Sequence, residues 1–154
     1  MGVYIMNITE FNNEILDLTR KINENINIIF NPVCEQYGLT ALQARILMKL
    51  HICEKHTIGS LAERVCSAEA NMSAMCKKLE KMDLIVRVRD KEDERVVKVN
   101  LTDKGKGIVF NINELLDEKI SKSIQGNMEE TLEDIIRGAK KLNDLLEKAV
   151  SSKG

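Results

Sequence analysis

Side chains that can contact nucleic acid gather between residues 67 and 95. Ser67 is a favourable helix N-cap, and the apolar spacing after it predicts a helix with one polar face. On that face an asparagine can pair with adenine, small side chains can approach a thymine methyl group, and lysines can bind phosphate. The alternative for each lysine is an ordinary solvated helix face. The candidate DNA contacts on this helix are Ser67, Ala70, Asn71, Ser73, Ala74, Lys77 and Lys78.

A charged loop at residues 90–95 supplies the second group of candidates. It joins two segments, 84–89 and 96–101, whose β-branched residues predict the strands of a hairpin with a solvent-exposed tip. Asp93 lies two residues before Arg95 and could orient its guanidinium group toward DNA. The alternative is a surface ion pair, worth about 0–1 kcal/mol. The candidate DNA contacts of the hairpin are Arg87, Lys91, Asp93 and Arg95, and Arg89 and Lys98 could add phosphate contacts.

The distribution of charge favours a local contact with nucleic acid. The whole chain of 154 residues has a net charge of −1, which argues against general wrapping by a polyanion. Residues 60–106 hold 11 basic and 9 acidic side chains and form the one net-basic stretch. This excess is small, so the position of each charge matters more than the total.

The elements that must hold these contacts follow from hydrophobic periodicity. The spacing predicts a long helix over residues 11–33, which Pro32 could interrupt, and a second helix that Thr40 caps with Gln43. Two short helices over 58–65 and 67–81 precede the hairpin, and His56 with Thr57 falls in a polar break before them. Thr102 then caps a long helix that Gly126 ends, and a last helix starts near Asn127. The predicted fold is mainly α with a small β-wing.

This order of elements is that of a winged helix-turn-helix with long N- and C-terminal dimerisation helices. We assign residues 39–101 to the winged helix-turn-helix DNA-binding region, and residues 1–38 and 102–154 to a helical dimerisation region, within one compact chain. The terminal helices carry apolar stripes that exceed the needs of so small a core. Because isolated helices gain little stability without tertiary packing, the sequence predicts a homodimer.

The motifs resemble those of the multiple-antibiotic-resistance regulator (MarR) family of winged helix-turn-helix repressors. The family's wing pattern D-x-R-x-x-x-V-x-L-T-x-x-G is matched at each fixed position from Asp93 to Gly105. Leu39-Thr40, Leu61-Ala62 and Leu79-Glu80 match the starts of three further family segments, the last of which runs to Arg87. Two departures are Asp83, where the family has glycine, and Ala74, where it often has a basic residue. Aspartate tolerates the left-handed backbone that such a turn requires.

The resemblance implies a transcriptional regulator, more often a repressor, that binds a pseudopalindromic operator of double-stranded DNA as a homodimer. It implies that Arg95 enters the minor groove, where narrow A/T-rich segments concentrate negative potential. It also implies release by a small lipophilic or aromatic effector, whose pocket residues the sequence does not identify. We expect no cofactor.

Two other functions remain open. The first is a thiol-based redox-sensing repressor, since cysteines stand at positions 34, 53, 66 and 76, with Cys66 at a turn. The commoner reading is that these thiols are reduced and structural. The second is a winged-helix module for protein–protein assembly, because a fold does not dictate a function.

Enzymatic and metal-binding functions have little support. His51, Cys53 and His56 form a weak metal-binding hint that matches no standard ligand spacing. Gly105-Lys106-Gly107 lacks the spacing of a phosphate loop, and no catalytic set stands out. We therefore expect no enzyme and no metal site. Since we find neither a signal peptide nor a membrane-spanning run, we expect a cytoplasmic protein that does not contact the membrane.

Overall fold

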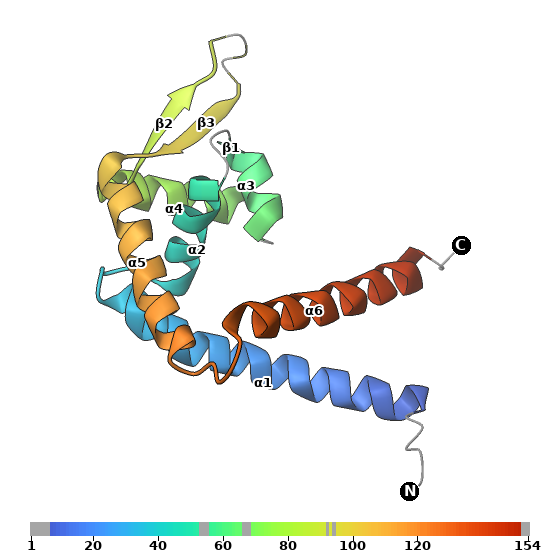
Figure 1. Cartoon of the computed structure of the whole chain (residues 1–154). Coiled ribbons are helices and arrows are strands. Elements are labelled where there is room, and N and C mark those ends of the chain that lie inside the picture. The colour runs from blue at the N-terminus through green and yellow to red at the C-terminus, as the bar shows by residue number, and fades with distance from the viewer. Residues whose placement is uncertain (1–6, 53–55, 66–68, 92, 94, 152–154) are drawn as a thin grey trace, which may run out of the picture. The chain divides into compact units, whose positions relative to one another are not determined.

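A computed structural model describes residues 7–52, 56–65, 69–91, 93 and 95–151 (Figure 1). The chain divides into two compact units, Met1–Leu116 and Asp117–Gly154. The predicted order of helices and hairpin is confirmed. The elements are α1 (Ile8–Glu35), α2 (Ala41–Ile52), β1 (His56–Thr57), α3 (Ile58–Val65), α4 (Glu69–Lys81), β2 (Ile85–Arg89), β3 (Val97–Leu101), α5 (Asp103–Ser121) and α6 (Met128–Ser151).

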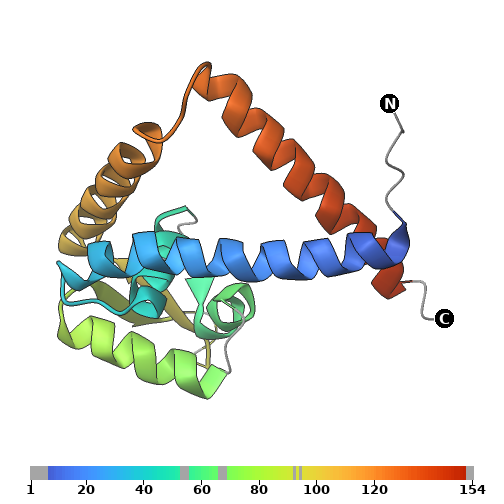
Figure 2. The same cartoon turned by 90° about the horizontal axis from the view of Figure 1, so that it is seen from below.

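Helix α1 begins at a capping box, in which the side chain of Asn7 accepts the backbone N–H of Glu10 and the Glu10 carboxylate accepts that of Asn7. The helix continues through Pro32, so the interruption that the sequence suggested does not occur. Only Phe30, Val33 and Cys34 are buried, and they lie in its last two turns. Most of α1 therefore extends beyond the core that α2, α3 and α4 build (Figure 2).

Helix α2 supplies the centre of the core of the first unit. Its start is the predicted capping box, since the Thr40 amide donates to Gln43 Oε1 at 2.8 Å and the Gln43 amide to Thr40 Oγ1 at 3.3 Å. The core side chains come from every element of the unit, which explains why the short helices α3 and α4 are stable here. The largest fully buried ones include Ile46, Leu47, Leu61, Met72, Leu79, Leu84, Ile85, Val99, Val109 and Ile112.

The sheet has three antiparallel strands in the order β1-β3-β2. The wing is the hairpin of β2 and β3, and it extends away from α3 and α4 (Figure 1). The prediction of a polar break at His56 and Thr57 is wrong, because His56 pairs with Val99 and is buried. A two-residue strand is too short to show a periodicity of two. Thr57 and Ser60 then exchange hydrogen bonds that begin α3.

One backbone junction joins α4, the wing and α5. Asp83 has φ of 59°, so the predicted left-handed turn is confirmed. The Leu84 amide donates to Leu79 O and the Asp83 amide to Glu80 O, a Schellman cap of α4. Leu84 O then accepts the Thr102 amide, and a Cβ at Gly105 would lie 2.1 Å from this same oxygen. Gly105 is therefore required by close backbone packing.

The second unit consists of the end of α5 and all of α6. Helix α5 ends at Ser121, five residues before the predicted end at Gly126, and Gly126 has φ of 88°. As predicted, α6 begins after Asn127, whose side chain accepts the Glu130 amide. None of the residues of α6 is buried within the chain. Among the described residues no helix is long and apolar enough to cross a membrane.

Candidate nucleic-acid interface

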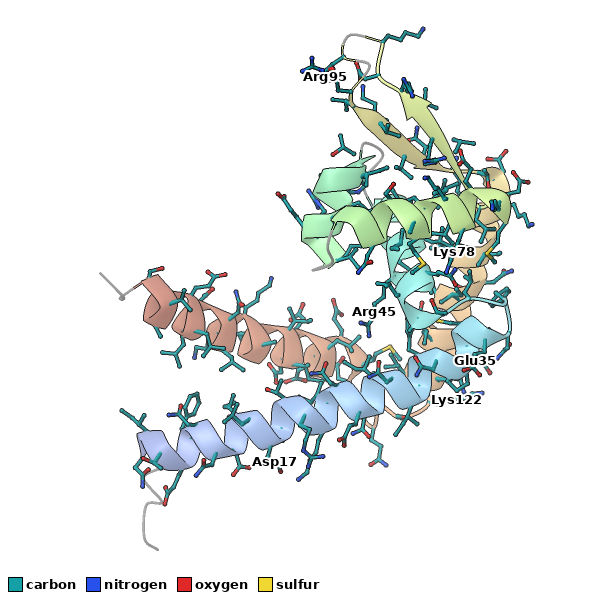
Figure 3. All side chains as sticks on the ribbon, turned by 180° about the vertical axis from the view of Figure 1, so that it is seen from behind. Asp17, Glu35, Arg45, Lys78, Arg95 and Lys122 are labelled. Atoms are coloured by element: carbon teal, nitrogen blue, oxygen red, sulfur yellow. The ribbon has the colours of Figure 1, made fainter. Side chains whose placement is uncertain are left out.

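Helix α4 has one face in the core and one face open to solvent. The sequence predicts that Met72, Met75, Cys76 and Leu79 are buried; all are buried except Met75, which is half-buried against the core. The side chains on the other side are exposed, and Figure 3 shows Lys78 among them. This pattern fixes which residues a groove of DNA could reach. The exposed residues are Asn71, Ala74, Lys77, Lys78 and Lys81.

Three of the candidate contacts at the start of α4 need separate comment. Ser67 lies outside the part of the chain that the structure describes, and so does the side chain of Ala70. Ser73 is half-buried, and it lines a cleft beside the wing instead of joining the exposed face. Five of the seven candidates on the helix can therefore be placed, and four of these form one exposed surface.

The tip of the wing is held by a carboxylate turn. Asp93 Oδ1 accepts the backbone N–H of Arg95 at 3.0 Å, and the Val96 amide donates to Asp93 O at 2.9 Å. The sequence suggested that Asp93 could orient the Arg95 guanidinium, whereas in the structure its side chain accepts the Arg95 backbone N–H. Asp93 thus shapes the tip, and the Arg95 side chain is exposed near it (Figure 3).

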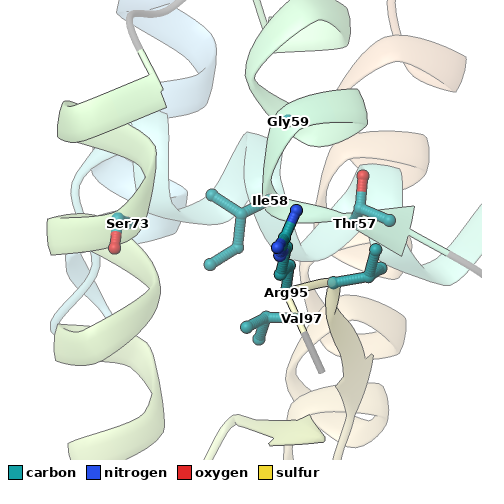
Figure 4. Close-up of a pocket in the computed structure, with 7 residues that line it drawn as sticks. Thr57, Ile58, Gly59, Ser73, Arg95 and Val97 are labelled. Atoms are coloured by element: carbon teal, nitrogen blue, oxygen red, sulfur yellow. The ribbon is translucent and has the colours of Figure 1, made fainter. Parts of the chain in front are cut away.

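Arg95 also lines a cleft between the wing and the two helices of the helix-turn-helix. Figure 4 shows its side chain beside Thr57 of β1 and Ile58 at the start of α3, with Ser73 of α4 on the far side. The volume of this cleft is about 560 Å³. Arg95 of the wing and Ser73 of α4 therefore line the same cleft, and the start of α3 lies between them.

Arg87 does not share this exposed position. It is half-buried, and it forms an ion pair with Glu80 of α4, in which Nε and Nη2 donate to Glu80 Oε2 at 2.8 and 2.5 Å. This hydrogen bond is the main reason why the pKa of Glu80 lies below its usual range. The sequence placed Arg87 with the phosphate contacts and did not identify this partner. Lys91, by contrast, is exposed at the far end of β2.

Part of the charge on the remaining wing residues is paired within the wing. Lys98 of β3 pairs with Asp90, so neither is fully available to a partner molecule. Arg89 is exposed at the end of β2, and no carboxylate of the described residues pairs with it. The exposed cations nearest to the tip are thus Arg89, Lys91 and Arg95.

The cysteines and histidines that could serve other chemistry differ in position. Cys34 and Cys76 are buried, and burial raises the pKa of both thiols, which lowers their reactivity. Cys53 and Cys66 lie outside the described residues. Burial also lowers the pKa of His56. In the described part of the chain, no three His, Cys, Asp or Glu side chains are grouped to hold a metal.

The comparison with family models connects this geometry to known proteins. Residues 28–112, more than half of the chain, match the family model described as transcriptional regulator SarA/Rot. The chain is also 35% identical over 79 residues to the HTH-type transcriptional regulator SarZ of Staphylococcus epidermidis, which is 51% of this chain and 53% of SarZ. The chain thus spans about half the length of the curated relatives it matches.

Solved structures share the fold. The transcriptional regulator BldR of Sulfolobus solfataricus has a TM-score of 0.70 and 27% identity, over 88% of this chain and 99% of that one. A MepR mutant of S. aureus bound to an oligodeoxyribonucleotide has a TM-score of 0.62 and 24% identity, over 83% and 95%. Structures of MarR itself are similar too, so the resemblance seen in the motifs extends to the fold. On the match of residues 28–112, the chain belongs to the SarA/Rot family of transcriptional regulators.

Proposed function

We propose that this protein is a non-catalytic transcriptional regulator that binds a pseudopalindromic operator of double-stranded DNA. The observation that carries the proposal is the exposed face of α4, where Asn71, Ala74, Lys77 and Lys78 lie together while the opposite face is buried. This face has no large apolar side chain, which argues against the alternative of an assembly module. Membership of the SarA/Rot family and the oligonucleotide-bound relative support DNA as the partner.

In the proposed complex, α4 enters the major groove. The N-terminal half of a recognition helix reaches the base edges, so Asn71 and Ala74 would read sequence, while Lys77 and Lys78 would contact phosphate. Arg95 would enter the minor groove beside the wing. Its exposed guanidinium and the turn that Asp93 makes around its backbone support this assignment.

The protein would act as a homodimer. Helix α1 exposes an apolar stripe that includes Leu18, Ile22 and Ile26, and no residue of α6 is buried within the chain. Apolar surface of this extent needs a partner, and a second copy covers it by symmetry. Two copies of α4 would then read half-sites about 34 Å apart.

Repression is the simpler direction of control, because a dimer on a promoter excludes polymerase without further contacts. We propose release by a small lipophilic or aromatic effector and place the protein in the cytoplasm, where it would meet its operator. The thiol-sensing alternative has less support, since the two described cysteines are buried. It would have to use Cys53 or Cys66.

A gel-shift titration with the promoter of the protein's own gene tests the proposal. We expect a complex that resists unrelated competitor DNA and weakens steeply as salt rises. Arg95→Ala should weaken this complex severely and leave the dimer intact, whereas Lys140→Ala on α6 serves as a control that should bind as the wild type does. Binding that is weak and equal for all sequences would direct the search to protein partners. Normal binding by Arg95→Ala would refute the role of the wing.

A further inference from the structure

We propose that Glu80 and Arg87 form a brace that holds the wing at a fixed angle to α4, so that only Arg89 of these two arginines contacts DNA phosphate. The inference rests on the proposed function, because it assigns roles within the same DNA-binding surface. It concerns two arginines of one strand, two positions apart. Neighbouring side chains alternate in a strand, so both project from the same face of the wing.

The brace joins two elements across the turn that connects them. Glu80 lies in the last turn of α4, and Arg87 is the third residue of β2. Two nitrogens of the guanidinium group donate to one carboxylate oxygen, at 2.8 and 2.5 Å. Charge-assisted bonds of this length are stronger than neutral ones and restrict the orientation of both side chains.

The surroundings of the pair reduce its access to solvent. The exposed fractions are 26% for the Arg87 side chain and 37% for that of Glu80. Cys76, one turn before Glu80, is buried and lies close enough for both charges to affect the pKa of its thiol. The ion pair therefore covers the core at the base of the wing. A phosphate that bound Nε and Nη2 of Arg87 would have to replace Glu80.

The turn below the pair is fixed separately. The Thr102 hydroxyl donates to Asp83 O at 2.8 Å, and Lys104 Nζ donates to Met82 O at 2.9 Å. These bonds tie the turn to α5, and β1 holds β3 through the pairs of His56 with Val99 and of Thr57 with Lys98. Strand β2 is the outer strand of the sheet, and the Glu80–Arg87 brace attaches it on the α4 side.

Arg89 lacks such a partner within the described residues. It is exposed, and it pairs in register with Val97, one step nearer to the tip than Arg87, which pairs with Val99. A free cation at this position can bind a phosphate at the cost of its own hydration alone. Arg89 is therefore the better phosphate ligand, and it provides a matched control for Arg87.

The variant Glu80→Gln distinguishes a brace from a contact by the sign of its effect. If Arg87 is part of a brace, the loss of the carboxylate loosens the wing, and operator affinity falls by about tenfold, the cost of one specific contact. If Arg87 instead contacts phosphate, the same change removes a competing anion and frees the cation. Operator affinity would then rise, and this result would overturn the proposal.

The salt dependence of binding separates the two arginines. A residue that neutralises one phosphate contributes about 0.9 to the slope of log affinity against log salt. We expect Arg89→Gln to lower the slope by about this amount, and Arg87→Gln to weaken binding with little change in slope. A lower slope in Arg87→Gln together with an unchanged slope in Arg89→Gln would contradict the proposal. The exchanged pair Glu80→Arg with Arg87→Glu should recover part of the affinity lost by Glu80→Gln.

A measurement without DNA tests the brace independently of the proposed function. Hydrogen–deuterium exchange at the amides of β2 and β3 should be faster in Glu80→Gln and Arg87→Gln than in the wild type, and unchanged in Arg89→Gln. Unchanged exchange in all three variants would overturn the brace. If the wild type binds no operator but the exchange results hold, the brace stands and only the proposed function fails.

Discussion

Helices α4 and α6 each leave one side uncovered, but the chemistry of the two surfaces is opposite. The exposed face of α4 carries Asn71, Ala74, Lys77 and Lys78, and its apolar residues are buried in the core of its own unit. On α6 the exposed residues include most of the large apolar ones. These are Met128, Leu132, Ile135, Ile136, Leu145, Leu146 and Val150.

The difference supports the partner that we propose for each helix. The apolar side chains of α4 are already buried in the core of its own unit, so its polar face remains exposed and could contact a polyanion. The apolar stripe of α6 is still exposed, although a helix with such a stripe is stabilised mainly by burying it. Under the proposed function, α4 would be folded before it meets DNA, whereas α6 would gain stability from the second copy of the chain. Mutations in α6 should therefore disrupt dimer formation, whereas mutations on the exposed face of α4 should disrupt DNA binding.

The largest effect should come from a charge in the apolar stripe of α6. Ile136 is 54% exposed within the chain, and Ile136→Asp would bury a carboxylate in the dimer interface. Because an unpaired buried charge costs several kcal/mol, we expect the dissociation constant of the dimer to rise by at least about 100-fold. Analytical ultracentrifugation over a range of concentrations measures this change.

Lys141→Asp is the matched control on α6, because Lys141 is exposed outside the apolar stripe. It introduces the same side chain and should leave the dimer intact. A dimer that survives Ile136→Asp would contradict the assignment of the stripe to the interface. The winged region of the Ile136→Asp monomer should remain folded, since its core is its own.

A smaller effect, independent of protein concentration, should follow from Gly105→Ala. The added Cβ would lie 2.1 Å from Leu84 O, so the first turn of α5 must move away from the junction with the wing. Such overpacking costs about 1–3 kcal/mol of unfolding free energy. Urea denaturation at fixed protein concentration gives the value.

Gly107→Ala provides the comparison within the same helix. No atom lies within 4 Å of a Cβ built there, and alanine favours the helix by about 0.5–1 kcal/mol. The two variants should therefore change stability in opposite directions. Equal effects would mean that the junction adapts to a side chain at position 105.

These two glycines show which parts of the fold were predictable. The sequence predicted the helices, the hairpin and the buried side of α4, because each depends on local hydrophobic periodicity or on a helix cap. It identified Gly105 as the last fixed position of the wing pattern but not the reason for a glycine there, since the oxygen that Gly105 faces belongs to Leu84, 21 positions earlier. The strand at His56 was missed for the same reason, because its partner is Val99.

The candidate site was predictable to a similar extent. The exposed face of α4 followed from periodicity alone, whereas the roles within the wing depended on partners. Arg87 and Arg89 look equivalent in sequence, and the position of Glu80 across a tight turn distinguishes them. The role of Asp93 differed as well, since it bonds the backbone of Arg95. Residue spacing predicts the helices and strands, but it does not predict which side chains pair between them.

The pH dependence of folding stability should distinguish the core of the first unit from α6. His56 is buried, its Nε2 has no hydrogen-bond partner among the described residues, and burial with the nearby Arg64 charge lowers its pKa below 6.5. The unfolded chain then binds the proton more readily than the native one, so stability falls as the pH drops below 6.5. His56→Leu should reduce this loss between pH 7.5 and 5.5.

His51→Gln is the control, because His51 is exposed and should leave the pH dependence of the wild type unchanged. The urea midpoint at the two pH values measures the effect. An equal loss of stability in the wild type and His56→Leu would show that other groups govern the acid sensitivity. The effect belongs to the core of the first unit, so it should persist when Ile136→Asp has separated the dimer.

The smallest effect should come from a single lysine on the exposed face of α4. Lys77→Gln removes one phosphate contact, so it should lower the slope of log affinity against log salt by about 0.9 and weaken binding to all sequences equally. Lys141→Gln on α6 removes the same charge from the chain at a position that should face no DNA. If both variants lower the slope by the same amount, affinity depends on overall charge, and the contrast between α4 and α6 does not extend to DNA. If only Lys77→Gln does so, the polar face of α4 is the surface that DNA contacts.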